Sequence, residues 1–309
     1  MEFSPHIRIG TRNSDLALWQ ANQVKTALEQ QGYSLVLVPI RTTGDLNRNV
    51  PFAALGQRGI FTSELDRALL RKEIDIAVHS LKDVPTTLPE DLGLIPVFNR
   101  ADSSDVLVYK TDPEILFSQP TPLIATGSIR RKAQWLHRFP THRITGLRGN
   151  VDNRLKQLTE NPWEGAIFAR AGLERIGILP ENSLDLPWMI PCPAQGILAV
   201  ACRKADARIN EIIFSLSNPE VVLLAQVERD FLQCVEGGCM APVGALAEIK
   251  GNDVFFKGCL LSLDGTTQLT VNRQSAREDA AELGQQAALQ ILENGGKQVI
   301  ENIRRESHD

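Results

Sequence analysis

The sequence has few cysteines, and they lack the spacing of a metal site. The 309 residues contain five cysteines, an odd number, and no two of them form a Cys-x-x-Cys pair. Zinc sites commonly use cysteines paired in that way. We therefore expect reduced thiols, a cytoplasmic location and no bound metal, since disulfides persist mainly in oxidising compartments.

Long apolar runs are also missing. No stretch approaches the roughly 20 apolar residues that a membrane-spanning helix requires. Residues 1–6 contain neither a basic region nor an apolar region, so we expect no secretory signal and no membrane partner. With 43% hydrophobic and 23% charged residues, the composition is typical of a soluble globular protein. The length indicates two or three domains.

Positive charge is slightly outnumbered overall but concentrated in one window. The formal net charge is −4, yet residues 125–175 contain ten Lys and Arg against four Asp and Glu. Eight of the ten are arginines, whose planar guanidinium group fits a carboxylate or phosphate through two parallel hydrogen bonds. Several stand beside Gly, Ser or Asn, which leave room for backbone N–H groups to approach the same anion. The window predicts a pocket for a small polyanion.

Two other interpretations of this window stay open. Arginines on a helix such as 128–138 often form a solvated face. Nucleic acid is another candidate, because basic clusters are its usual footprint. The pI near 5.8 and the confinement of the excess charge to one window argue against that partner. Aromatic residues are also few there, whereas single-strand binding combines basic with stacking side chains. We expect no nucleic-acid partner.

The first third of the chain alternates short apolar strands with helical patterns. Strands are expected over 6–11, 34–40 and 74–78, and helices over 14–30 and 61–72. A nearly continuous apolar run, as in the second of these strands, is typical of a strand buried on both faces. This order predicts a parallel, layered α/β domain.

A second series of strands and helices begins near residue 103. The expected strands cover 105–109, 123–126, 143–147 and 165–169, with helices over 128–138 and 150–159. Four prolines in 178–193 indicate a crossing segment, and 197–202 predicts a buried strand that returns to the first domain. Two such domains joined by more than one segment are expected to enclose a cleft, which is a preferred site for small ligands.

The last ~90 residues change character. A helix over 219–233 precedes strands near 243–249, 253–262 and 267–273, and a helix over 276–294 follows. Asp264 and Gly265 predict the turn of a hairpin.

Polar residues directly follow the buried strand 74–78. Groups at the end of such a strand project toward the predicted cleft. Asp83, beside Lys82, is a candidate for acid–base or electrostatic catalysis, and a surface ion pair is the alternative. His79 is interpreted as a structural histidine.

Cys239 follows two glycines, Gly237 and Gly238. This setting leaves a thiol unshielded and permits an unusual backbone, which suits a reactive or modified cysteine. A buried, inert cysteine is the alternative, and Cys234 is a competitor without neighbouring glycines.

Two serines stand where a strand leads into a helix. Ser128 is expected to cap the helix that begins with Arg130 and Arg131, and helix N-termini offer N–H groups to anions. Ser14, close to Arg12, occupies a similar position near the N-terminus.

Taken together, six segments resemble the porphobilinogen deaminase (hydroxymethylbilane synthase) family. They occur in order along residues 6–300 and cover 10–14, 77–85, 126–131, 147–154, 171–175 and 236–239. The resemblance implies an α/β protein of three domains, formed by residues 1–99 with 195–216, by 100–194 and by 217–309. The first two would resemble the halves of periplasmic binding proteins around a cleft. The third would be a small α/β domain with a three-stranded antiparallel sheet.

The resemblance also implies an activity. The chain would be a transferase of tetrapyrrole (haem) biosynthesis that condenses four porphobilinogen molecules, with loss of ammonia, on an enzyme-bound dipyrromethane primer. Hydrolysis would then release the linear tetrapyrrole hydroxymethylbilane. The dipyrromethane cofactor would be attached through a thioether to Cys239. We expect a cytoplasmic monomer with porphobilinogen as its small-molecule partner.

Site residues follow from the same resemblance. Asp83 would be catalytic, because a fixed carboxylate stabilises the cation that forms when porphobilinogen loses ammonia. The rings carry acetate and propionate groups, which arginine and serine donors can bind. The resemblance places Lys82, Ser128, Arg130 and Arg131 around the cofactor, and Arg12, Ser14, Ser80, Arg148, Arg154 and Arg175 around the incoming substrate.

Four positions depart from the family pattern. Asp15 stands where proline is common, Arg58 where lysine is common, and Gly127 where Ser or Thr is common. Ala194 stands where glycine is expected. Gly127 removes a hydroxyl donor and Asp15 adds a negative charge, so these departures bear on efficiency and leave Asp83 and Cys239 untouched.

Overall fold

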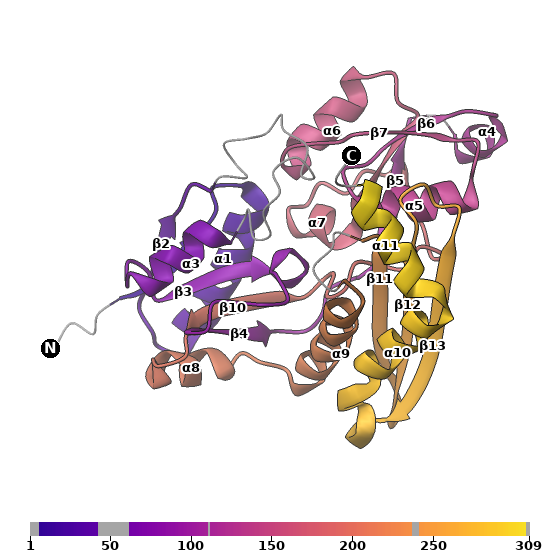
Figure 1. The fold of residues 1–309 in the computed structure, drawn as a ribbon. Coiled ribbons are helices and arrows are strands. Elements are labelled where there is room, and N and C mark those ends of the chain that lie inside the picture. The colour runs from indigo at the N-terminus through magenta and orange to yellow at the C-terminus, as the bar shows by residue number, and fades with distance from the viewer. Residues whose placement is uncertain (1–5, 43–61, 111, 237–240, 307–309) are drawn as a thin grey trace, which may run out of the picture. The chain divides into compact units, whose positions relative to one another are not determined.

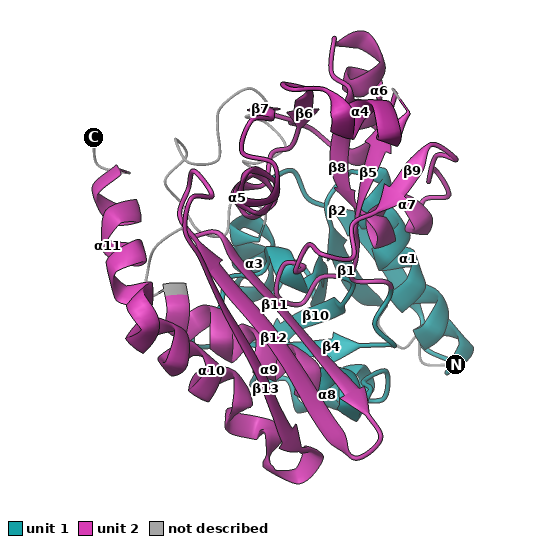
Figure 2. Cartoon of the chain, turned by 90° about the vertical axis from the view of Figure 1, so that its right-hand side faces the viewer, with its two compact units in different colours: residues 1–101, 196–222 teal, residues 102–195, 223–309 magenta. Residues whose placement is uncertain are grey.

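The computed structural model describes residues 6–42, 62–110, 112–236 and 241–306 (Figure 1). The chain forms two compact units, one of residues 1–101 with 196–222 and the other of 102–195 with 223–309 (Figure 2). The chain therefore leaves the first unit, builds part of the second and returns. The further division into three domains at the boundaries given above stays a prediction.

The first unit is built on a five-stranded sheet. Its strands and helices are β1 (Ile7–Thr11), β2 (Leu35–Pro39), β3 (Ile76–Ser80), β4 (Leu92–Val97), β10 (Leu198–Arg203), α1 (Asp15–Gln30), α3 (Ser63–Leu70), the 3-10 helix η2 (Leu81–Asp83) and α8 (Ala207–Phe214). The strand order is β2-β1-β3-β10-β4. β1 runs parallel to β2 and β3, as predicted.

The other half of this sheet differs from the prediction. β10 runs antiparallel to both β3 and β4, so the sheet is mixed, and the prediction of a parallel domain was wrong here. β10 does return to the first unit, as predicted. β4 was not predicted, because Gly93 and Pro96 interrupt its apolar pattern and both residues are uncommon inside strands.

Helix α1 shows why the sequence pattern identified the helices well. Ser14 caps it, with the hydroxyl oxygen accepting a hydrogen bond from the Ala17 N–H. Its buried residues recur every three or four positions, which places them on one face against the sheet. They are Ala17, Gln20, Ala21, Val24 and Leu28.

The second unit contains another five-stranded sheet. Its elements are β5 (Asp105–Tyr109), α4 (Pro113–Ser118), β6 (Leu123–Ala125), α5 (Ile129–Arg138), β7 (Arg143–Thr145), α6 (Val151–Glu160), β8 (Gly165–Ala169), α7 (Arg170–Arg175) and β9 (Ser183–Asp185). The order is β7-β6-β8-β5-β9. β6 is parallel to β7 and β8, whereas β5 is antiparallel to β8 and β9. The short strand β9 was missed, because it lies in the proline-rich crossing segment.

A separate three-stranded sheet completes the second unit. Its elements are α9 (Pro219–Glu236), β11 (Val243–Lys250), β12 (Asp253–Leu261), β13 (Gln268–Ala276), the 3-10 helix η3 (Arg277–Glu282), α10 (Leu283–Ile291), the single π turn η4 (Leu292–Gly296) and α11 (Lys297–Glu306). The strands are antiparallel in the order β11-β12-β13. The α/β class and this separate antiparallel sheet are confirmed.

The end of the chain departs from the predicted single helix over 276–294. β13 extends to Ala276 and the α-helix begins only at Leu283. Gly295 has a φ of 105°, which kinks the chain before α11. The predicted hairpin turn is confirmed, since Asp264 and Gly265 lie between β12 and β13.

The buried Glu228 binds the backbone directly after the crossing segment 178–193. Ala194 is buried and has a φ of 62°, a left-handed conformation that favours glycine. This agrees with glycine being the expected residue there. The Ala194 N–H donates to Glu228 of α9 at 2.6 Å, and Ala247 N–H of β11 donates to the other carboxylate oxygen at 2.7 Å. Glu228 therefore links three segments that are distant in sequence.

Helices α9 and α10 approach each other closely at Gly284. A Cβ atom at this position would lie 2.0 Å from the Val227 carbonyl oxygen. We expect Gly284→Ala to destabilise the protein by about 2–4 kcal/mol, because the helix backbones must move apart. Urea denaturation measures the change. Gly146→Ala is the control, since nothing lies within 4 Å of its added methyl group. Equal stability of both variants would contradict the prediction.

Within the described residues, no helix combines the length and apolar character needed to cross a membrane.

Candidate active site

In the first unit, two adjacent strands bring predicted substrate-binding residues to one edge of the sheet. β1 and β3 are parallel neighbours, with Gly10 opposite Ala77. Their carboxyl ends therefore lie together, and Arg12 follows one strand while Ser80 ends the other.

Gln20 is a residue of this edge that sequence reasoning missed. It is buried on α1, and its side-chain amide donates a hydrogen bond of 2.8 Å to the Ser80 hydroxyl oxygen. This hydrogen bond orients the Ser80 hydroxyl group, whose own proton can still be donated to a ligand. A glutamine on the buried face of an amphipathic helix was the available signal, since buried polar groups usually have a specific partner.

Asp83 lies at the end of the short helix η2, directly after β3. Its side chain is exposed and that of Lys82 is half-buried. The Val84 N–H bonds to the Leu81 carbonyl, which fixes the turn. A carboxylate held at the end of a buried strand and open to solvent can receive a ligand without prior displacement of packed side chains.

His79 is a buried residue of the same strand. Burial, assisted by the positive charge of Arg12, lowers the pKa of His79 to about 4. The imidazole is therefore neutral near pH 7 and adds no charge to the anion-binding edge. Its Nε2 atom is buried and has no hydrogen-bond partner among the described residues.

In the second unit, parallel strands place the segments that follow them, which contain the arginine motifs, at one edge of the sheet. β6 lies between β7 and β8, and all three run in the same direction. Ser128 follows β6 and caps α5, accepting from the Arg131 N–H at 3.4 Å. Arg148 lies between β7 and α6. These residues therefore stand at one sheet edge, beside helix N-termini that attract anions.

Three arginines of this unit are partly buried and suited to anions. Arg154 on α6 donates from Nε to the Gly149 carbonyl at 2.8 Å, which directs its guanidinium group. Burial lowers the pKa of Arg148, and lowers the pKa of Arg175 to about 10. A carboxylate bound beside such a group offsets the unfavourable desolvation of its charge.

Arg130 and Arg131 share a buried carboxylate, Asp105. Arg130 Nη1 donates to Oδ2 at 2.7 Å, and Arg131 donates to Oδ1 from Nε at 3.0 Å and from Nη2 at 2.8 Å. The Arg130 and Arg131 side chains are only 5% and 8% exposed, and that of Asp105 is 0% exposed. The predicted cofactor-binding pair thus already has one internal anion.

Asp105 was also missed from the sequence, although it is the one acidic residue of an otherwise apolar strand, β5. Gln195 Nε2 donates to its Oδ1 at 2.9 Å. Burial alone raises the pKa of Asp105, but the charges of Arg130 and Arg131 outweigh burial and hold the pKa well below its usual range. Asp105 is therefore ionised at neutral pH.

The departures from the family pattern have different surroundings. A Cβ atom at Gly127 would lie 2.3 Å from the Leu147 carbonyl oxygen, so this backbone cannot accept a serine without moving. Asp15 is exposed in the first turn of α1, where its negative charge interacts favourably with the helix dipole. Arg58 lies outside the described residues.

Four cysteines lie in the described part of the chain, and all are free thiols. Burial raises the pKa of Cys202 to about 11 and that of Cys259 to about 12, so neither forms a thiolate readily. Cys234 is exposed, but partial burial and Asp230 also raise its pKa. Cys239, the predicted attachment point, lies outside the described residues.

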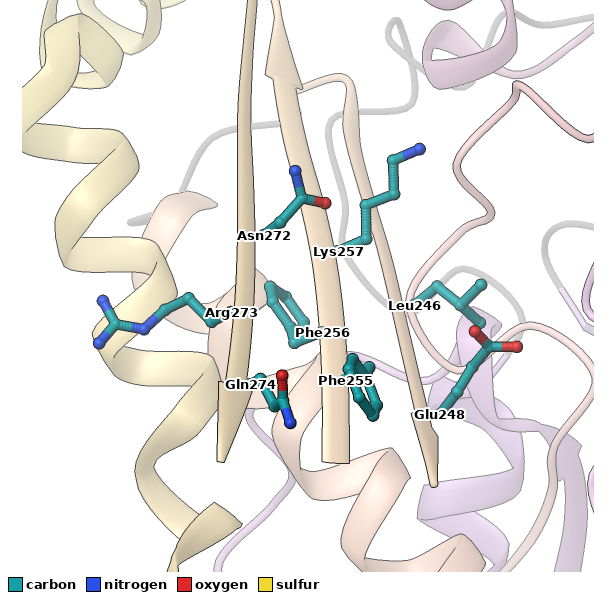
Figure 3. Close-up of a pocket in the computed structure, with 8 residues that line it drawn as sticks. All are labelled: Leu246, Glu248, Phe255, Phe256, Lys257, Asn272, Arg273 and Gln274. Atoms are coloured by element: carbon teal, nitrogen blue, oxygen red, sulfur yellow. The ribbon is translucent and has the colours of Figure 1, made fainter. Parts of the chain in front are cut away.

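A pocket lies on the three-stranded sheet, and its lining contains none of the predicted site residues that the structure describes. Figure 3 shows Leu246 of β11, Phe255 and Lys257 of β12 and neighbouring side chains around it. Its described lining includes no Cys, Ser or Thr, and none of the arginines of the two sheet edges is among its lining residues. Across the described ranges, no group of three His, Cys, Asp or Glu residues could hold a metal ion.

Taken separately, the residues at each of the two edges fit carboxylate groups of a cofactor. They supply guanidinium, ammonium and hydroxyl donors, and the Arg130 Nε atom is buried with no hydrogen-bond partner among the described residues. A buried donor of this kind gains from an incoming carboxylate, because leaving it unsatisfied is unfavourable. The donor set therefore agrees with the dipyrromethane implied by the sequence resemblance.

Comparison with protein families matches nearly the whole chain. Residues 7–211 match the domain described as "Porphobilinogen deaminase, dipyromethane cofactor binding domain", and residues 222–293 match "Porphobilinogen deaminase, C-terminal domain". The first match alone includes every site residue predicted above except Cys239, which lies in the second.

Individual relatives agree. A porphobilinogen deaminase from Rubrobacter xylanophilus is 39% identical over 297 residues, which cover 96% of this chain and 97% of the relative. One from Geobacter sulfurreducens is 38% identical over 301 residues, with 96% and 94% covered. A periplasmic substrate-binding protein from Coxiella burnetii has a TM-score of 0.43 at 14% identity, over 72% of this chain and 96% of that structure; a similarity at that level carries no information about ligands. The family matches and the relatives together show that the chain belongs to the porphobilinogen deaminase family.

Proposed function

We propose that this chain is a hydroxymethylbilane synthase. It condenses four molecules of porphobilinogen in sequence, releases one ammonia for each, and then hydrolyses the product from the enzyme as a linear tetrapyrrole. The observation that carries the proposal is the match of both family domains, in order and over nearly the full length. Relatives at 36–39% identity support it.

The cofactor in this proposal is a dipyrromethane joined through a thioether to Cys239. When bound, it supplies the pyrrole carbon to which the first substrate is joined. Lys82, Ser128, Arg130 and Arg131 would hold its carboxylates. Covalent attachment makes each coupling effectively intramolecular, which removes much of the entropic barrier.

The incoming porphobilinogen carries an acetate and a propionate group. Arginine binds such groups through paired, charge-assisted hydrogen bonds, and serine hydroxyls add neutral donors. Gln20 would orient Ser80 for this purpose through its 2.8 Å hydrogen bond. The substrate-binding residues in this proposal are Arg12, Ser14, Ser80, Arg148, Arg154 and Arg175.

Asp83 would carry the chemistry. Loss of ammonia from porphobilinogen leaves a cation whose charge lies largely on the ring nitrogen. A carboxylate beside that nitrogen stabilises the cation and can accept or return the protons of deamination and rearomatisation. The exposed position of Asp83 at the end of η2 allows such an approach. The proposal further includes a monomeric, cytoplasmic enzyme and a cleft between the first two domains.

Incubation of the purified protein with porphobilinogen tests the proposed function. We expect consumption of porphobilinogen, release of one ammonia per molecule consumed, and accumulation of a linear tetrapyrrole. This product should cyclise slowly, with loss of water, to a porphyrinogen, which dioxygen from air then oxidises to a porphyrin. A protein that binds porphobilinogen without consuming it would instead be an anion-binding protein. That result would contradict the proposal.

A further inference from the structure

We propose that Asp105 is a positioning residue for the cofactor: it balances one of the two charges of Arg130 and Arg131 and leaves the pair with a single net positive charge for a cofactor carboxylate. The inference rests on the proposed function, and it concerns a residue that none of the family motifs quoted above contains.

The geometry shows one carboxylate serving two arginines. Both Asp105 oxygens are used, Oδ2 by Arg130 and Oδ1 by Arg131 and Gln195, all at 2.7–3.0 Å. The three ionised side chains are almost fully buried. Since a buried charge without a partner is strongly unfavourable, two arginines could not be held there without at least one internal anion.

Backbone carbonyls fix the two guanidinium groups further. Arg130 Nη1 also donates to the Ile190 carbonyl at 2.7 Å, and Arg131 Nη1 donates to the Ile167 carbonyl at 3.0 Å. The Gln134 side-chain amide makes two hydrogen bonds to the Ile190 backbone: it donates to the carbonyl at 2.8 Å and accepts from the N–H at 2.7 Å. These contacts restrict both arginines before any ligand arrives.

One positive charge remains after Asp105 is counted. Two guanidinium groups and one carboxylate give the cluster a net charge of about +1, since arginine stays protonated and Asp105 stays ionised. Burial lowers the pKa of Arg131, whereas the charge of Asp105 outweighs burial at Arg130 and raises its pKa. The single carboxylate therefore offsets the desolvation of Arg130 but not that of Arg131. Arg130 Nε is, in addition, a buried donor with no partner among the described residues. A single carboxylate of the cofactor would satisfy both the charge and the donor.

This arrangement predicts that Asp105 and the cofactor stabilise the same two arginines. The test compares two preparations of the protein. One is loaded with the cofactor by incubation with porphobilinogen, and the other is produced in cells that cannot make porphobilinogen. We define the cofactor stabilisation as the melting temperature of the first minus that of the second. In Asp105→Asn the cofactor becomes the main counter-anion of the pair. We expect the cofactor-free form to melt much lower and the cofactor stabilisation to increase by about 5 °C or more.

The variant Arg130→Gln is expected to act in the opposite direction. Its cluster is neutral without the cofactor, so the cofactor stabilisation should fall below that of the wild-type protein. Even if cofactor-free Asp105→Asn does not fold, this second variant can still refute the inference. Unchanged cofactor stabilisation in Arg130→Gln, or unchanged or smaller cofactor stabilisation in Asp105→Asn, would overturn the inference, because the pair would then be purely structural.

The first unit offers a matched control. Asp75 also lies between two arginines, accepting from Arg8 at 2.9 Å and from Arg203 at 3.2 Å, and neither of these arginines is a proposed cofactor residue. Asp75→Asn should lower both melting temperatures equally. An increase in cofactor stabilisation equal to that of Asp105→Asn would overturn the inference as a general effect of destabilisation. If the wild-type protein itself gains no pyrrole mass from porphobilinogen, the proposed function fails and this inference fails with it; a wild-type protein that loads normally isolates the role of Asp105.

Discussion

Replacement of Asp83 by Asn is expected to lower the turnover of porphobilinogen by about 10²–10⁴-fold, the usual contribution of a positioned acid–base group. The amide has nearly the same shape but carries no charge. It can neither stabilise the cation left by ammonia nor accept its proton. Because Asp83 is exposed and lies in a short turn, the fold should not change. Ammonia release under single-turnover conditions measures the effect, and melting temperature checks the fold.

Glu90→Gln is the control for this prediction. Glu90 is an exposed carboxylate seven positions further along the same unit, and its neutralisation should leave turnover at the wild-type level. Intact mass should show the dipyrromethane in both variants. Near-normal turnover in Asp83→Asn would remove Asp83 from the proposed mechanism.

Replacement of Cys239 by Ser is expected to abolish turnover. A serine hydroxyl is far less nucleophilic than a thiolate and is not expected to form the proposed linkage. The purified variant should therefore lack the extra mass of two pyrrole units that the wild-type protein carries. Without a covalent primer, each coupling would become a reaction between freely diffusing molecules, which loses the large advantage of an intramolecular step. Intact-mass measurement before and after incubation with porphobilinogen is the direct readout.

Cys234→Ser provides the matched comparison. Cys234 is an exposed thiol on α9, only five residues before Cys239, and was the competing candidate in the sequence. Its replacement should leave both the added mass and the turnover intact. If Cys234→Ser loses the pyrrole units and Cys239→Ser retains them, the attachment point is Cys234.

Local patterns were sufficient to predict most elements of the fold. The cap at Ser14 and the hairpin turn at Gly265 were confirmed, because each depends on residues close together in the chain. Errors occurred where pairing partners are distant. The antiparallel entry of β10 between β3 and β4 depends on the path of the chain through the second unit, and no local pattern encodes that path.

The same distinction holds for the candidate site. The sequence by itself determined that Arg12, Ser80 and Asp83 stand at or just after strand ends, and it concentrated arginines in one window that predicts anion binding, since strand ends and helix caps have recognisable residues. Only the tertiary structure placed Gln20 against Ser80 and joined Asp105 to Arg130 and Arg131 across 25 or more residues. Burial and the balance of buried charge depend on which distant segments pack together, so the role of an acidic residue in a strand becomes visible only after folding.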